Sequence, residues 1–103
     1  MSEPATLPGI EQTPTVEPTE GSRTFTLPPW IVLLHNDDVN DMAHVVQALI
    51  KSVPKLSTER AVEVMMEAHN QGRAVVVTCP LELAELYRER LEGFGLTATI
   101  EKA

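Results

Sequence analysis

Two short polar segments of this sequence carry groups that could bind a small cation. The first is Asn36-Asp37-Asp38, and the second is the run of residues 68–74, which contains His69. Amide, carboxylate and imidazole groups all offer hydrogen-bond acceptors. The free amino terminus of a peptide is such a cation, because it presents three donors and, with a pKa of about 7.7 to 8.0, is mostly charged at neutral pH. The two segments therefore form a candidate amino-binding site if the fold brings them together.

Other uses of the same residues remain open on the sequence alone. Asn-Asp-Asp is a common turn, and a carboxylate placed before a helix is a common N-cap. A metal site could use His35, His69 and the two aspartates, but no His-x-x-x-His motif or cysteine pair supports it. Hydrolysis would need a nucleophile, and Cys79 lies at the far end of its expected strand from His69. We therefore expect no catalytic residue, no metal and no cofactor.

Two expected helices would position the polar segments. Residues 30–34 are a short run of strand-forming residues that the polar turn ends, and we expect this strand to be buried on both faces. Apolar residues then recur at helical spacing up to Pro54. A second helix is expected between its N-cap Ser57 and Gly72, which suits a left-handed C-terminal position. Because antiparallel neighbouring helices bring the start of one beside the end of the other, the turn and His69 could share a site.

The remaining elements complete a small α+β fold. Residues 73–78 predict a second strand, Pro80 opens a third helix at its first position, and Gly93 and Gly95 end that helix. Residues 97–100 alternate like a closing strand. The order β-α-α-β-α-β predicts a sandwich in which a three-stranded sheet carries three helices packed on one face.

Composition excludes several classes of protein. The chain has 103 residues and a formal net charge of −7, which argues against nucleic-acid binding because phosphate contacts need clustered Lys and Arg. One Trp, one Tyr and two Phe mean that the core must be mainly aliphatic. A single cysteine excludes an internal disulfide, and no apolar run could span a bilayer. We expect a cytoplasmic, monomeric protein without a secretory signal or a membrane partner.

The chain divides near Pro28. Six of its eight prolines lie at or before Pro29, mixed with Ser, Thr, Glu and Gly. Such a composition cannot bury enough apolar surface to fold. We expect residues 1–28 to be a disordered Pro- and Glu-rich extension and residues 29–103 to form one domain. The extension is either a solubilising leader or a tether for a partner.

Several motifs in this sequence resemble those of the ClpS family, the adaptors that bring N-degron substrates to the Clp AAA+ protease. They are His35-Asn36-Asp37-Asp38, then Met42, then residues 65–74 and finally residues 99–103. The resemblance covers roughly residues 30–103, and it implies the same fold as the one read from the residues. It also implies a non-enzymatic adaptor whose partners are a Clp AAA+ unfoldase of the ClpA or ClpC type and substrates beginning with Leu, Phe, Tyr or Trp.

The resemblance assigns roles to individual residues. Asn36, Asp38 and His69 would hold the substrate's α-amino group, with Asp37 a weaker candidate. A hydrophobic pocket would take the first side chain, and the matching positions are Leu34, Asn40, Met42, Val45, Met65, Ala68 and Leu96. The start of the third helix is implied as an unfoldase contact. Glu82 matches an acidic position there, whereas Tyr87 stands where relatives can carry Lys, and the alternative role of Glu82 is to interact with the helix dipole.

Departures from the family pattern fall on the pocket. Relatives commonly carry Thr at the position of Asn40, Pro at Asp41, an aromatic residue near Val39 and a branched residue at Ala68. Ala68 should enlarge the pocket, whereas Asn40 should make its rim bulkier and more polar. We expect large aromatic first residues to be favoured over Leu. The alternatives are a ClpS-like domain with altered or lost N-degron binding, which would modulate the unfoldase, and a ribosomal-stalk-type domain of the same topology.

Overall fold

The computed structural model describes residues 27–103, so most of the expected extension, residues 1–26, lies outside the described residues. Its elements are β2 (Pro29–His35), α1 (Met42–Ser52), α2 (Thr58–Gln71), β3 (Arg73–Pro80), α3 (Leu81–Gly93) and β4 (Ala98–Lys102). This order confirms the predicted β-α-α-β-α-β arrangement.

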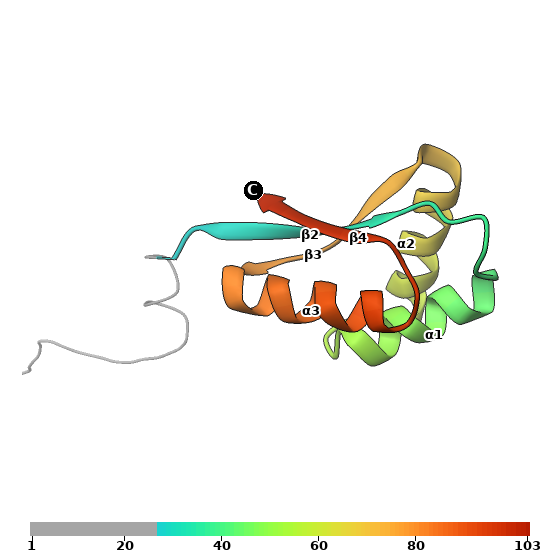
Figure 1. Ribbon diagram of the computed structural model, residues 1–103, viewed down its shortest axis with the longest axis horizontal. Helices are drawn as coiled ribbons and strands as arrows, with labels where there is room; N and C mark the ends of the chain where they lie inside the picture. Colours follow the sequence, from blue (N-terminus) through green and yellow to red (C-terminus); the bar gives the residue numbers. More distant parts are fainter. Residues whose placement is uncertain (1–26) are drawn as a thin grey trace, which may run out of the picture.

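Strand β2 is the centre of the sheet. The strand order is β3-β2-β4, and both pairings are antiparallel. All three helices lie on one side of this sheet (Figure 1). Val32, Leu33 and Leu34 are 0%, 6% and 2% exposed, and since consecutive residues point to opposite faces, the middle of β2 is buried on both, as expected. An irregularity in the β2–β3 register between Val32 and Leu33 is a feature that the sequence pattern did not reveal.

The core between the sheet and the helices is mainly aliphatic, as the composition predicted. Tyr87 is the one aromatic residue among the buried members of this core in the described part of the chain. The largest apolar side chains without exposed surface come from β2, α1, the residue that follows α1, α2 and α3, namely Val32, Leu49, Val53, Val64 and Leu91. One continuous core therefore fixes the helices relative to the strand that precedes the polar turn.

Local signals fix where the first two helices begin and end. The Asp41 side chain accepts a 2.8 Å hydrogen bond from the backbone N–H of His44, which caps α1. Ser57 caps α2 in the same way through the N–H of Arg60 at 3.1 Å, as predicted. Gly72 adopts a left-handed conformation with φ of 93°, and its N–H donates to the Ala68 carbonyl at 2.9 Å. The predicted C-terminal role of Gly72 is therefore confirmed.

Two boundaries in the second half of the chain differ from the sequence-based expectation. Pro80 is the N-cap of α3 rather than its first residue, because its ψ of 157° is extended and it still pairs with Pro29 of β2. The end of α3 is as predicted, because Gly93 is its last residue and Gly95 has a positive φ of 85°. Strand β4 runs to Lys102, which pairs with β2, instead of stopping at residue 100.

Replacing Gly72 tests its conformational role directly. A Cβ at this position would meet no heavy atom within 4 Å, so only the positive φ opposes a side chain. We expect Gly72→Ala to lower the free energy of unfolding by about 1–2 kcal/mol, the usual cost of the left-handed conformation. Urea denaturation provides the measurement. Gly93→Ala is the matched control, because that site is equally open but helical, and it should cause no loss.

Candidate functional site

A pocket of about 340 Å³ opens where the end of β2, the start of α1, the end of α2 and the loop before β4 meet. All eleven residues expected to form the α-amino site and the hydrophobic pocket line it. The lining also includes His35 and Asp41, which the sequence did not assign to this site. The complete lining is Leu34, His35, Asn36, Asp37, Asp38, Asn40, Asp41, Met42, Val45, Met65, Ala68, His69 and Leu96.

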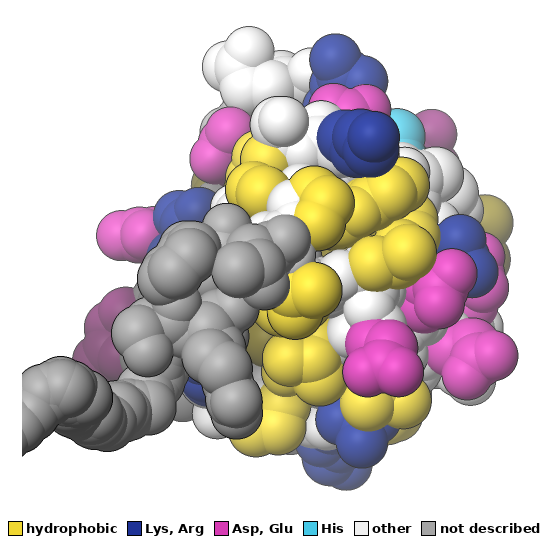
Figure 2. All heavy atoms as spheres, turned by 90° about the vertical axis from the view of Figure 1, so that its left-hand side faces the viewer, with side chains coloured by type: hydrophobic (Ala, Val, Ile, Leu, Met, Phe, Trp, Pro, Cys, Tyr) yellow, Lys and Arg dark blue, Asp and Glu magenta, His cyan; other side chains and the backbone are white. Residues whose placement is uncertain are grey.

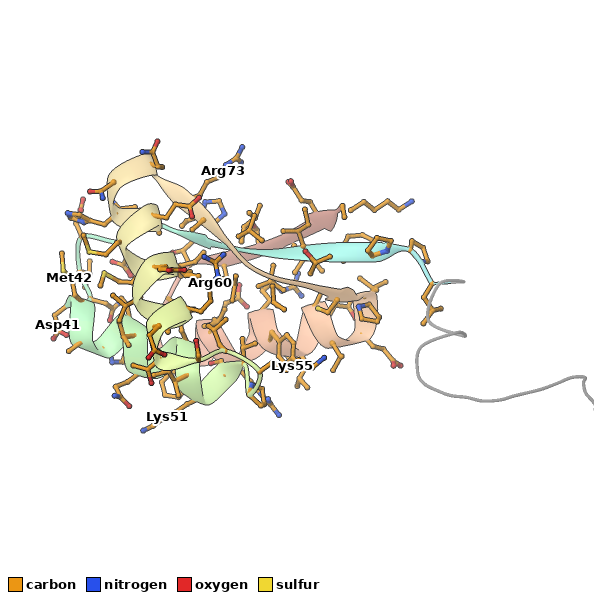
Figure 3. The ribbon with its side chains drawn as sticks, turned by 180° about the vertical axis from the view of Figure 1, so that it is seen from behind. Asp41, Met42, Lys51, Lys55, Arg60 and Arg73 are labelled. Atoms are coloured by element: carbon orange, nitrogen blue, oxygen red, sulfur yellow. The ribbon has the colours of Figure 1, made fainter. Side chains whose placement is uncertain are left out.

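The inner part of the pocket is apolar and buried. It is contributed by residues at most 8% exposed that also belong to the protein's core: Leu34, Val45, Met65, Ala68 and Leu96. Met42 differs, because it is 46% exposed at the first residue of α1. Figure 3 shows Met42 beside Asp41 at the start of that helix. The pocket thus has a fixed apolar floor and one exposed apolar side chain at its rim.

The polar part of the pocket is assembled by backbone hydrogen bonds. The N–H of Asn36 donates to the carbonyl of Gly72 at 2.9 Å, and the N–H of Gly72 donates to Ala68 at 2.9 Å. These two bonds tie the turn after β2 to the last turn of α2, which carries His69. The proximity of the two polar segments that we expected from antiparallel helices is therefore achieved through Gly72.

The candidate amino-binding groups remain available for a ligand. Within residues 27–103, the side chains of Asn36, Asp38 and His69 make no hydrogen bond to the rest of the chain. All three residues are exposed. They can supply an amide oxygen, a carboxylate and, in the neutral imidazole, a ring nitrogen, which are three different acceptors at one end of the pocket.

Asp37 uses its acceptors inside the turn. Its Oδ1 accepts from the backbone N–H of Val39 at 2.7 Å and of Asn40 at 3.3 Å, and its Oδ2 accepts from the Asn40 amide at 2.5 Å. The backbone bond from Val39 and the side-chain bond from Asn40 hold the pKa of the Asp37 carboxyl below its ordinary value. Asp37 therefore shapes the turn, and we leave it out of the proposed amino contacts.

Asn40 does more than fill the rim as expected, because it joins two walls of the pocket. Its Nδ2 donates both to Asp37 and, at 3.0 Å, to the carbonyl of Gly95. One turn further on, the Nε2–H of His44 donates to the carbonyl of Phe94 at 2.7 Å, and the two rings meet edge to face. Two successive carbonyls before Leu96 are thus held by the start of α1, which fixes the wall that Leu96 forms.

Reasoning from the sequence missed His44 and the pocket position of His35. His35 lies at the end of β2, and its Nε2 is 2.7 Å from the Thr99 hydroxyl of β4. Its place at the end of a strand next to Asn36 was a usable signal. For His44 there was none, because its partner is a backbone carbonyl 50 residues away in the chain.

The alternative chemistries considered for these residues receive no support from the described part of the chain. Within residues 27–103, no three His, Cys, Asp or Glu side chains are grouped so that they could hold a metal ion. Cys79 pairs with Trp30 near the start of β2, at the opposite end of that strand from Asn36. Burial raises the pKa of the Cys79 thiol, which disfavours the reactive thiolate.

The start of α3 lies at the other end of the molecule from the pocket (Figure 1). Apolar side chains gather on this end, with charged groups around them (Figure 2). On α3 itself Leu81, Leu83 and Leu86 are 39%, 38% and 37% exposed, and Glu82 is exposed in the first turn. Tyr87 is only 7% exposed and belongs to the core, so the expectation that it contacts an unfoldase is corrected.

Comparison with known proteins identifies the family. The sequence profile described as ATP-dependent Clp protease adaptor protein ClpS matches residues 26–99. The chain belongs to the ClpS family. The ATP-dependent Clp protease adapter protein ClpS of Synechococcus elongatus is 45% identical over 85 residues, covering 82% of this chain and 90% of that protein. The chloroplastic adapter CLPS1 of Chlamydomonas reinhardtii is 46% identical over 97 residues, covering 90% of this chain and 60% of that protein.

A solved ClpS structure agrees with the fold. Agrobacterium tumefaciens ClpS2 bound to L-phenylalaninamide has a TM-score of 0.66 and 32% sequence identity, covering 74% of this chain and 98% of that chain. The chain is therefore an adaptor-family protein of the Clp protease system. Within residues 27–103, no helix is both long and apolar enough to cross a membrane. Because ClpS relatives include chloroplastic proteins, a cytoplasmic location stays a prediction.

The Asp37 bonds predict a pH-dependent contribution to stability. Because hydrogen bonds lower the folded-state pKa below its ordinary value of 3.8, the stabilisation is complete above that value and is lost as the pH falls through the folded-state pKa. In urea denaturation, Asp37→Asn should therefore lower the free energy of unfolding by a constant amount near neutral pH and by less below about pH 4. Gln47→Ala, an exposed uncharged control, should show no such pH dependence, and a pH-independent Asp37→Asn effect would contradict the assignment.

Proposed function

We propose that this ClpS-family protein binds the free α-amino group and bulky first side chain of N-degron substrates and delivers them to a Clp AAA+ unfoldase for degradation. The observation that carries the proposal is the pocket itself, in which three acceptors without partners in the described chain adjoin a buried apolar floor. A peptide amino terminus has the complementary form, with three donors on a charged nitrogen next to one side chain.

The α-ammonium would bind at the polar end of the pocket. Asn36, Asp38 and His69 supply an amide oxygen, a carboxylate and an imidazole nitrogen, one acceptor for each donor. Hydrogen bonds to charged groups contribute about 1.5–3 kcal/mol each. Loss of translational and rotational freedom offsets much of that gain, so we expect dissociation constants of the order of micromolar for short peptides.

The first side chain would enter the apolar part of the pocket. The L-phenylalaninamide bound by the Agrobacterium relative has both a free amino group and an aromatic side chain, which is the combination proposed here. Ala68, 3% exposed in the floor, leaves room where a branched residue would project. Burial of a Leu or Phe side chain would contribute about 1.5–3 kcal/mol.

Delivery requires a second surface, which we place at the start of α3. Glu82 and the exposed Leu81 and Leu83 lie on this helix end, away from the pocket. An apolar surface with charged neighbours suits a protein partner. We propose that it contacts an unfoldase of the ClpA or ClpC type, so that substrate and unfoldase can be held together. The adaptor itself would perform no catalytic step.

The amino-terminal mechanism predicts that binding needs a free amine and His69. Fluorescence anisotropy with a C-terminally labelled peptide beginning with Phe should show binding, whereas its acetylated copy, which lacks the charge and two donors, should bind at least about tenfold more weakly. His69→Ala should weaken binding of the free peptide to a similar extent.

Asn70→Ala is the matched control for His69→Ala, because Asn70 is the exposed next residue on α2 and does not line the pocket. The Asn70→Ala variant should bind the free peptide with the affinity of the wild type. Equal binding of free and acetylated peptides would refute the mechanism. Failure of the folded wild type to bind either peptide would favour the alternative of a ClpS-like domain that has lost N-degron recognition and modulates the unfoldase.

The size of the pocket floor predicts a preference among first residues. Peptides beginning with Phe or Trp should bind more tightly than peptides beginning with Leu. Peptides beginning with β-branched Ile should bind least well because Met42 stands at the rim of the pocket. Ala68→Val should reduce the affinity for Phe by about tenfold while changing that for Leu much less, since the added methyl groups occupy the depth of the pocket. A titration series that ranks Leu above Phe in the wild type would overturn this preference.

A further inference from the structure

An apolar strip lies beside the pocket, and the function proposed above makes no use of most of it. It consists of Met42, Val46 and Ile50 on α1 and of Val62 and Met66 on α2. Met42 is 46% exposed, and Val62 and Met66 are each 40% exposed. Val46 and Ile50 are half-buried and pack against the core. Large apolar side chains at this level of exposure on two adjoining helices point to a surface with an occupant.

Two side-chain contacts indicate which side of each helix carries the strip. Arg60 reaches from α2 to the carbonyl of Val75 in β3 at 3.2 Å, so that side of α2 faces the sheet edge. Val62 and Met66 follow two and six residues later, which places them roughly on the opposite side of the helix. Figure 3 shows Arg60 on one side of α2 and Met42 on the other. Val62 and Met66 therefore lie on the side of α2 where Met42 stands.

The same reasoning applies to α1. His44 reaches the carbonyl of Phe94 in the loop before β4, which defines the side of α1 that faces α3 and this loop. Met42 and Val46 lie two residues before and after His44, on the opposite side, and Ile50 continues that row one turn further. The row therefore lies on the side of α1 turned away from α3, and α1 packs against α2. Each of the two packed helices thus carries one apolar row outside its fully buried face.

The strip is continuous with the pocket through one residue. Met42 lines the pocket and is also the first member of the strip. A peptide whose first residue occupies the pocket must leave past its rim, where Met42 stands. From Met42 to Ile50 the helix rises about 12 Å, which corresponds to about three or four residues of extended peptide. The strip therefore has the length of a short peptide segment.

The borders of the strip favour an extended segment over a folded partner. Exposed polar residues flank it on both helices, with Gln47 on α1 and Glu59 and Glu63 on α2. These residues confine the apolar surface to one row of side chains on each helix. A single extended chain fits such a surface, whereas a folded protein would have to bury the flanking carboxylates as well.

We propose that the apolar strip binds the residues that follow the first residue of an N-degron, so that this adaptor prefers substrates with large apolar side chains at positions three to five. The proposal rests on the proposed function, since the amino terminus must first be held in the pocket. The adaptor would then recognise two parts of a substrate, its first residue in the pocket and the following residues on the strip. The side chains of those following residues would change the affinity of the adaptor for the substrate.

Anisotropy titrations with two C-terminally labelled peptides test the proposal. Both begin with Phe-Ser, and they continue as Leu-Val-Leu or as Ser-Thr-Ser. Because two further side chains would be partly buried, the wild type should bind the apolar peptide about tenfold more tightly. The double variant Val62→Gln, Met66→Gln should abolish this difference. Neither residue lines the pocket, so competition by L-phenylalaninamide should be unchanged in the variant, which also shows that it is folded.

Leu86→Gln is the matched control, because Leu86 is 37% exposed on α3, a helix that contributes no residue to the pocket. It should keep the full difference between the two peptides. Equal affinities of the two peptides for the wild type would overturn the strip proposal alone, as would a difference that persists in the double variant. If L-phenylalaninamide and both peptides fail to bind, the proposed function is overturned and the strip proposal with it.

Discussion

The backbone of Gly72 is the constraint on which the site depends. Its left-handed conformation ends α2 just after His69, and its two polar groups bond in opposite directions, to Ala68 and to Asn36. A helix end and the turn after a strand, which are distant in the sequence, are thereby held at one point. The core and the pairing of His35 with Arg73 already bring the two segments close, and the bond from Asn36 to Gly72 links them directly. A ligand therefore has to order less of the site when it binds.

Three neighbouring aspartates illustrate how local geometry separates chemically identical groups. Asp41 caps α1, Asp37 closes the turn through Val39 and Asn40, and Asp38 has no partner within the described residues. Two of the three carboxylates therefore stabilise the turn and the start of α1, and the third remains available to bind a cation. Asn40 contributes to this division, because its amide donates to both Asp37 and Gly95 and so links the turn to the opposite wall of the pocket.

Much of the fold followed from the sequence because its signals are local. Helical spacing, the cap at Ser57 and the glycine at position 72 each act within one turn of chain, and the structure confirms them. The pocket residues came from the resemblance to a family, and all of them line one cavity. The features that were missed depend on contacts between distant segments. The bond from His44 to Phe94 and the register change in β2 have no local signature. The role of Pro80 was misjudged because strand pairing with Pro29 outweighed its preference for the first turn of a helix.

The central position of β2 has a mechanical consequence. The chain enters the described domain at Pro29, at the end of the molecule that carries the start of α3, and continues at once into the one strand that is paired on both sides. A force applied to the chain before Pro29 and directed along β2 would load the ladders to β3 and β4 together. The edge strands would not separate one hydrogen bond at a time, since both ladders would have to shear at once. A pull on the chain before Pro29 would thus act first on β2, the strand held by two hydrogen-bonded ladders. The force needed to unfold the domain would therefore be highest at the first step.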